Sequence, residues 1–142
     1  MEYFTKNRKE TDILGATLAR EIIKSKSKKA LILALEGELG SGKTTFIQGF
    51  AKGLGIKRRI LSPSFLILRL YSLKNFNFYH LDCYRIKKTK EILDLGFKEI
   101  IKEKKVVVVI EWADKIYQIL PKNIIEIKFK WLGENERKII IK

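Results

Sequence analysis

Apolar residues recur at helical spacing along several stretches of the chain. Residues 11–24 carry leucine and isoleucine on one face, so they predict an amphipathic helix with Thr11 or Asp12 as its N-cap. Residues 89–102 carry the same pattern and predict another helix, in which Gly96 is the weak point. Two further helices are expected over residues 45–54 and 113–120.

Other stretches follow the patterns of β-strands. Residues 30–35 and 106–110 are continuous apolar runs, which predict strands buried on both faces of a sheet. Residues 125–131 alternate between apolar and polar side chains, and a turn at residues 133–135 leads into 137–141, so a C-terminal hairpin is expected. Another hairpin is expected from residues 65–71 and 76–81.

The order of these elements predicts the fold class. Strands and helices alternate in the middle of the chain and hairpins lie toward its ends, so we expect an α/β, three-layer sandwich around a mixed, largely parallel sheet. The length of 142 residues suits one domain, and neither a repeat nor a linker divides the chain. A single domain spanning residues 1–142 is therefore expected.

Composition narrows the class of protein. Charged residues make up 32% and are interleaved with a 46% hydrophobic fraction, which is typical of a globular chain. No apolar run approaches the roughly 18 residues that cross a bilayer, and the start lacks an apolar signal core, so we expect a cytoplasmic protein without a membrane partner. The lone Cys83 excludes an internal disulfide and a cysteine-rich metal site, and it is expected to pack in the core.

The chain is strongly basic, with 30 Lys and Arg against 16 Asp and Glu, a net charge of +14. Such a surplus attracts phosphate polymers, so direct contact with a nucleic acid is one interpretation. The other is a solvated lysine-rich surface, because the basic clusters lie near predicted element ends. Charge alone does not choose between them.

A glycine-rich loop is the most specific feature of the sequence. Residues 37–44, Gly-Glu-Leu-Gly-Ser-Gly-Lys-Thr, match the Walker A pattern G-x-x-x-x-G-K-[ST] and lie between a predicted buried strand and a predicted helix. Glycines let backbone N–H groups turn around a phosphate, and the following helix directs its positive dipole end at the same anion. Lys43 is expected to bridge the β- and γ-phosphates, and the Thr44 hydroxyl to ligate Mg²⁺.

Two acidic residues are candidates for the chemistry of a bound nucleotide. Glu111 ends the apolar run 106–110, the position of a metal-side carboxylate at the end of a central strand. Asp82 lies two residues from His80, so both face the same side of a strand and could orient water or hold a metal shell. The alternative is that His80 and Asp82 form a surface hydrogen-bonded pair. Trp112 is either part of the site or a lid on the core.

The segment Ser62-Pro-Ser-Phe65 carries two hydroxyls around a rigid proline, on the loop after the second predicted helix. Several P-loop proteins place a γ-phosphate-sensing segment here. Ser-Pro is also an ordinary turn signal, so the spacing alone leaves both interpretations open.

Taken in order, these motifs resemble the TsaE (YjeE-like) family, the P-loop ATPase component of the bacterial machinery that makes threonylcarbamoyladenosine on tRNA. The resemblance runs from about Thr11 to Arg137. It is carried by the glycine-rich loop through Thr45 and by the motifs Ser-Pro-Ser-Phe65, His-Leu-Asp-Cys-Tyr-Arg85, Leu95-Gly96 and Ile-Glu-Trp112.

The resemblance implies a single-domain P-loop NTPase-type fold, ATP and Mg²⁺ as cofactors, and slow ATP hydrolysis. It also implies association with the two-protein threonylcarbamoyl transferase complex (TsaB and TsaD-like subunits), which acts on adenosine 37 of ANN-decoding tRNAs and through which tRNA is reached. Lys43, Asp82 and Glu111 are then the catalytic residues, and Thr44, Glu111 and Asp82 hold the metal. The nucleotide-binding residues are Thr11, Glu38, Leu39, Gly40, Ser41, Gly42, Lys43, Thr44, Thr45, Ser64 and Arg137.

Departures from the family pattern leave two roles weaker. Ser64 stands where the family usually has threonine, so the hydroxyl for γ-phosphate sensing is kept without its methyl group. The match of Arg137 to a family arginine rests on a short hairpin. Because no in-cis arginine finger is evident, we expect partner-stimulated hydrolysis. A small-molecule or nucleoside kinase and a nucleotide-gated scaffold are the alternative functions.

Overall fold

The computed structural model describes residues 1–25, 29–60 and 67–142 of the chain. The Ser62–Phe65 segment, with the candidate Ser64, lies outside the described residues. The chain divides into two compact units, one comprising Met1–Lys26, Gly37–Ser62 and Ile127–Lys142, the other Ser27–Glu36 and Pro63–Glu126. Each unit has its own strands and helices.

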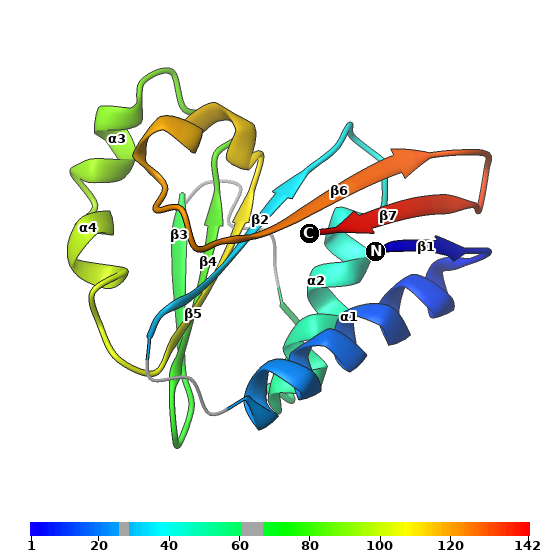
Figure 1. Cartoon of the computed structure of the whole chain (residues 1–142), viewed down its shortest axis with the longest axis horizontal. Helices are drawn as coiled ribbons and strands as arrows, with labels where there is room; N and C mark the ends of the chain where they lie inside the picture. Colours follow the sequence, from blue (N-terminus) through cyan, green and yellow to red (C-terminus); the bar gives the residue numbers. More distant parts are fainter. Residues whose placement is uncertain (26–28, 61–66) are drawn as a thin grey trace. The chain divides into compact units, whose positions relative to one another are not determined.

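The first unit combines an antiparallel sheet with two helices. Its strands are β1 (Glu2–Thr5), β7 (Arg137–Ile141) and β6 (Ile125–Trp131), with β7 paired to both others. Its helices α1 (Arg8–Lys24) and α2 (Lys43–Leu54) lie side by side (Figure 1). Glycine makes this close approach possible, because a Cβ atom on Gly49 would overlap the backbone carbonyl of Asp12, and one on Gly15 would overlap that of Phe46.

The second unit is built on a sheet in the order β2, β5, β4, β3. The strands are β2 (Leu31–Glu36), β5 (Val106–Glu111), β4 (Asn77–Asp82) and β3 (Leu68–Ser72). β5 is parallel to both β2 and β4, and β3 pairs antiparallel with β4 at the edge. The carboxyl ends of three parallel strands therefore meet at one edge of this sheet.

One face of this sheet is covered within the second unit. The helices α3 (Thr89–Leu93) and α4 (Phe97–Ile100) and the 3-10 segment η1 (Ala113–Ile119) lie over it, as the left half of Figure 1 shows. Alternate residues of the parallel strands, such as Ala34, Leu81 and Ile110, form a continuous buried cluster with Phe97 and Ile116. The other set of alternate residues, which includes His80 and Glu111, therefore faces away from these helices.

The α/β class, the mixed sheet and the C-terminal hairpin are confirmed, and the buried runs 30–35 and 106–110 are strands. Two local predictions are wrong. The predicted helix over 89–102 is two short helices, because Gly96 adopts φ 86° and starts α4. Helix α1 begins earlier than expected and is capped by neither Thr11 nor Asp12.

The cap of α1 is Asn7, which has an extended backbone and whose Oδ1 accepts a hydrogen bond from the Glu10 N–H at 2.9 Å. The Glu10 carboxylate in turn accepts from the Lys6 N–H at 3.0 Å. The spacing Asn-x-x-Glu is a capping signal that the apolar periodicity did not include. Thr11 is thereby inside the helix, where its hydroxyl lies 2.8 Å from that of Thr5 on the unpredicted strand β1.

Candidate nucleotide-binding site

The glycine-rich loop turns the chain into the N-terminus of α2. Gly40 (φ 77°) and Gly42 (φ 102°) adopt the left-handed conformation that a side chain disfavours. Gly42 is the N-cap residue of α2, and no side chain caps this end of the helix. The first N–H groups of α2 are thus available to an anion, in the field of the helix dipole.

Lys43 lies on the inside of this loop. Its ammonium group donates hydrogen bonds to the carbonyl of Gly37 and, at 3.0 Å, to that of Glu38, although only 6% of the residue is exposed. An ammonium group forms its strongest hydrogen bonds with anionic acceptors such as phosphate oxygens. Lys43 is therefore a suitable donor for a phosphate chain bound in the loop.

Two further features fit a polyanion. Ser41 is buried, and its hydroxyl has no hydrogen-bond partner among the described residues. A Cβ atom on Gly37 would lie 2.8 Å from the Ser41 Oγ and 2.9 Å from the Phe129 Cβ, so the loop needs a glycine where it leaves β2. An orphaned hydroxyl and backbone donors around a buried lysine match the phosphates of a nucleotide.

Thr11 and Arg137 border the loop at Gly42, and their predicted contact with a nucleotide stays a prediction. The Thr11 Cγ2 and the Arg137 Cγ lie 3.7 and 3.6 Å from the position of a Cβ on Gly42. The Thr11 hydroxyl is hydrogen-bonded to Thr5, and one Arg137 nitrogen donates to the carbonyls of residues 133 and 136 at 2.8 and 2.9 Å. Both residues thus shape the wall beside Gly42.

The remaining loop residues differ in exposure. Glu38, Leu39, Gly40 and Thr44 are exposed, and Thr45 is half-buried. Leu39 is 72% exposed at the loop tip, so its side chain contributes little to the protein core. Thr44 in the first turn of α2 presents its side chain on the solvent side of the helix.

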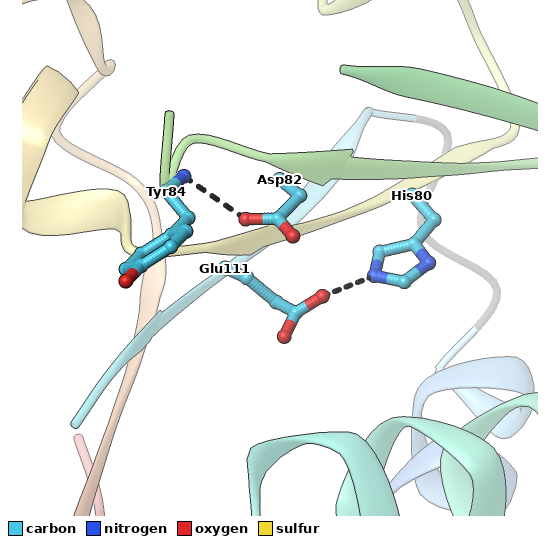
Figure 2. A network of polar contacts seen from close by, with 4 residues as sticks. All are labelled: His80, Asp82, Tyr84 and Glu111. Carbon is cyan, nitrogen blue, oxygen red and sulfur yellow. Dashed lines mark hydrogen bonds and ion pairs between the residues drawn. The ribbon is translucent and has the colours of Figure 1, made fainter. Parts of the chain in front are cut away.

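A second polar cluster lies in the second unit, where β4 and β5 run side by side. His80 Nε2 and Glu111 Oε2 are hydrogen-bonded at 2.7 Å, and both residues are buried, at 2% and 6% exposure (Figure 2). Asp82 is the direct register partner of Glu111, and its Oδ1 accepts from the Tyr84 N–H at 3.0 Å. His80 and Asp82, predicted to share one face of a strand, thus lie beside Glu111 of the neighbouring strand.

The chain leaves this cluster through a strained residue. Trp112 has φ 57°, which is uncommon for a bulky side chain, and its ring lies against that of Tyr84 with 5.1 Å between centroids. Lys115 donates a hydrogen bond to the Tyr84 carbonyl and lies over the same ring. The contacts of Tyr84 with Trp112 and Lys115 stabilise the sharp turn that follows Glu111.

Cys83 lies beside this cluster, but its thiol is unreactive at neutral pH. Its burial, reinforced by the nearby Asp82 carboxylate, raises the pKa of the Cys83 thiol to about 12. A thiol with this pKa stays protonated at neutral pH, so Cys83 is a packing residue.

Sequence reasoning missed one contact that lies close to the loop along the chain. The Tyr117 hydroxyl donates to Glu36 Oε2 at 2.8 Å, and Glu36 immediately precedes Gly37. Burial, with the Glu36 carboxylate as acceptor, raises the pKa of the Tyr117 phenol. The partners are 81 residues apart, and no local pattern joins them.

The predicted site residues thus fall into two groups. Lys43 and Thr44 with their neighbours Thr11 and Arg137 belong to the first unit, and Asp82 and Glu111 belong to the second. A magnesium ion held by Thr44 together with both acids stays a prediction. Within the described ranges, no group of three or more His, Cys, Asp or Glu side chains is placed to hold a metal ion.

A Walker A loop that leaves a buried strand and opens a helix in an α/β fold defines a P-loop protein. The family model described as "Threonylcarbamoyl adenosine biosynthesis protein TsaE" matches residues 5–139. The chain belongs to the TsaE family.

Individual relatives agree with the family model. The tRNA threonylcarbamoyladenosine biosynthesis protein TsaE of Bacillus subtilis is 43% identical over 113 residues, covering 80% of this chain and 70% of the relative. The TsaE protein of Rickettsia felis is 37% identical over 132 residues, covering 92% and 73%. The crystal structure of YdiB from B. subtilis matches with a TM-score of 0.78 and 33% identity, covering 99% of this chain and 83% of that one.

Proposed function

We propose that this protein is a Mg²⁺-dependent ATPase, slow in isolation and activated by its partners, that serves the threonylcarbamoyladenosine modification of adenosine 37 in ANN-decoding tRNAs. The buried Lys43 ammonium inside the Walker A loop carries the proposal, because it is a cation held within the loop whose uncapped helix N-terminus favours a phosphate. Family membership supports the pathway.

The roles of the residues follow from their chemistry. Lys43 exchanges the Gly37 and Glu38 carbonyls for β- and γ-phosphate oxygens, and the N–H groups of the loop hold the same oxygens. Thr44 and Glu111 supply the hydroxyl and carboxylate for Mg²⁺, which neutralises charge on the phosphates when bound. Asp82 orients the attacking water or completes the metal shell. His80 fixes the Glu111 carboxylate through the 2.7 Å hydrogen bond.

The arginine beside the loop supports partner activation. One terminal guanidinium nitrogen of Arg137 donates to hairpin carbonyls, and its Nε is buried without a hydrogen-bond partner among the described residues, so the guanidinium group is held against its own hairpin. An arginine finger is worth roughly 10³ to 10⁵ in rate, so an ATPase without one hydrolyses slowly until a partner supplies the missing group or reorders the site. The proposed partners are the two subunits of the threonylcarbamoyl transferase, through which the protein reaches tRNA.

The proposal extends to the organisation and location of the protein. We propose that residues 1–142 act as one P-loop ATPase domain in the cytoplasm, where the tRNA is modified. No helix in the described part of the chain has the length and apolar character needed to cross a membrane.

ATP hydrolysis with and without the two transferase subunits tests the proposal. The wild-type protein is expected to hydrolyse ATP slowly alone and much faster with the subunits, and Lys43→Ala is expected to lose ATP binding in calorimetry. The matched control is Lys52→Ala on the same helix, whose side chain is exposed and paired with Asp12, and it should behave as wild type. Equal rates with and without the subunits would contradict partner activation.

Glu111→Ala separates hydrolysis from binding. The variant is expected to bind ATP, fail to hydrolyse it and fail to support tRNA modification. Full modification by a variant without hydrolysis would favour a nucleotide-gated scaffold. Transfer of labelled phosphate to a nucleoside or sugar would favour the kinase alternative.

A further inference from the structure

Trp131 is a large aromatic residue that the fold leaves uncovered. It ends β6 and is 59% exposed. The alternation of the strand puts it on the same face as Phe129, whose ring meets the Phe46 ring of α2 edge-on at 5.4 Å. Trp131 therefore lies on the sheet face that α2 covers, one step beyond the last covered residue.

The contacts of neighbouring residues place Trp131 at the phosphate end of α2. Phe129 lies beside Gly37, the first glycine of the loop. Trp131 is two residues further along the strand, a rise of about 7 Å. Its direct partner on β7 is Arg137, whose side-chain carbon lies 3.6 Å from the position of a Cβ on Gly42. Because paired side chains on one face are about 5 Å apart at Cβ, the indole lies one side chain away from the loop.

The position suits the base of a nucleotide rather than its phosphates. A ribose separates the base from the phosphates, so a base platform has to stand beside the phosphate loop and not within it. An indole offers a flat apolar face, and stacking on it is tolerant of base identity because every base has a π-face. The exposed indole loses unfavourable contact with water when a base covers it.

We propose that Trp131 is the base-stacking residue of the nucleotide site, and that it receives the purine of the nucleoside triphosphate whose phosphates the Gly37–Thr44 loop holds. The inference rests on the proposed function. It predicts that Trp131 contributes to the affinity for ATP and nothing to the affinity for a bare phosphate chain, and that GTP gains from the same contact.

Calorimetric titration with Mg-ATP and with magnesium tripolyphosphate tests this. Stacking on an aromatic side chain is worth about 1–3 kcal/mol per base. Trp131→Ala is therefore expected to weaken the affinity for ATP about 5- to 150-fold and to leave the affinity for tripolyphosphate unchanged. Trp131→Phe keeps an aromatic face and should restore most of the ATP affinity. Because the side chain is exposed, these variants are expected to fold, which circular dichroism checks.

Phe4→Ala is the matched control. Phe4 is 63% exposed and pairs with Lys138, so it lies on the opposite face of the same sheet, away from the loop. It should bind both ligands as wild type does. Unchanged ATP binding by Trp131→Ala, or an equal loss for tripolyphosphate, would overturn the inference and leave the proposed function standing. Failure of the wild-type protein to bind either ligand would overturn both.

Discussion

Replacing His80 by alanine tests the polar pair on β4 and β5. The His80 and Glu111 side chains meet at 2.7 Å, and with 2% and 6% exposure neither can exchange its partner for bulk water. The His80 ring nitrogen is the hydrogen-bond partner of the Glu111 carboxyl group. The variant leaves that buried carboxyl group without this partner.

The expected cost follows from that burial. A buried polar group left without its hydrogen-bond partner costs about 1–3 kcal/mol. We expect His80→Ala to lower the free energy of unfolding by about 1–3 kcal/mol. His80→Gln retains an N–H donor at a similar reach and should lose less than half as much.

Urea unfolding of a double-mutant cycle isolates the pair. His80→Ala, Glu111→Ala and the double variant are expected to give a coupling free energy of about 1–3 kcal/mol. The control cycle pairs His80→Ala with Glu99→Ala on α4, which covers the opposite sheet face, and its coupling should be near zero. A coupling free energy below about 0.5 kcal/mol would show that the His80 and Glu111 side chains do not stabilise each other.

Three further predictions concern the surrounding structure. Gly49→Ala should lower the free energy of unfolding measured in urea. The added Cβ overlaps the Asp12 carbonyl, at a cost of about 1–3 kcal/mol or more, which outweighs the gain in helix propensity of about 1 kcal/mol. An unchanged urea midpoint would contradict the close contact between the two helices. Cys83 has a raised pKa in the folded state, so its contribution to the free energy of unfolding is full below pH 9 and is lost as the pH rises toward about 12. In urea titrations at a series of pH values, Cys83→Ala should therefore lose less stability at alkaline pH than the wild type does. Parallel pH profiles for the two proteins would contradict this. Tyr117→Phe removes the hydrogen bond to Glu36 and should lower the free energy of unfolding by about 1 kcal/mol in the same assay, and an unchanged midpoint would contradict this expectation.

Local patterns predict most of the elements of this fold. Continuous apolar runs predict the buried strands β2 and β5, and alternation predicts β6 and β7, because burial on two faces or one directly sets the order of apolar side chains. The single helix predicted over 89–102 is wrong for a local reason: the apolar spacing continues through Gly96, whereas α3 already ends at Leu93 and Gly96, with its positive φ, is the N-cap of α4. Strand β1 was not predicted, because its four residues are too few to show an alternation of apolar and polar side chains.

Local patterns also predict one part of the candidate site and miss another. The Walker A loop is contiguous, so its residue types alone indicate phosphate binding, and the two-residue spacing of His80 and Asp82 places them on one face. The His80–Glu111 hydrogen bond joins residues 31 apart, and its geometry depends on the parallel register of β4 and β5. Strand register and long-range contacts are set by tertiary packing, which local periodicity does not encode.

A crystal structure with Mg²⁺ and a non-hydrolysable ATP analogue would show whether the loop binds a triphosphate through Lys43. We expect the Lys43 ammonium to leave the carbonyls of Gly37 and Glu38 and to donate to β- and γ-phosphate oxygens, with the loop N–H groups around the β-phosphate. An analogue bound elsewhere, with Lys43 still on the two carbonyls, would contradict it.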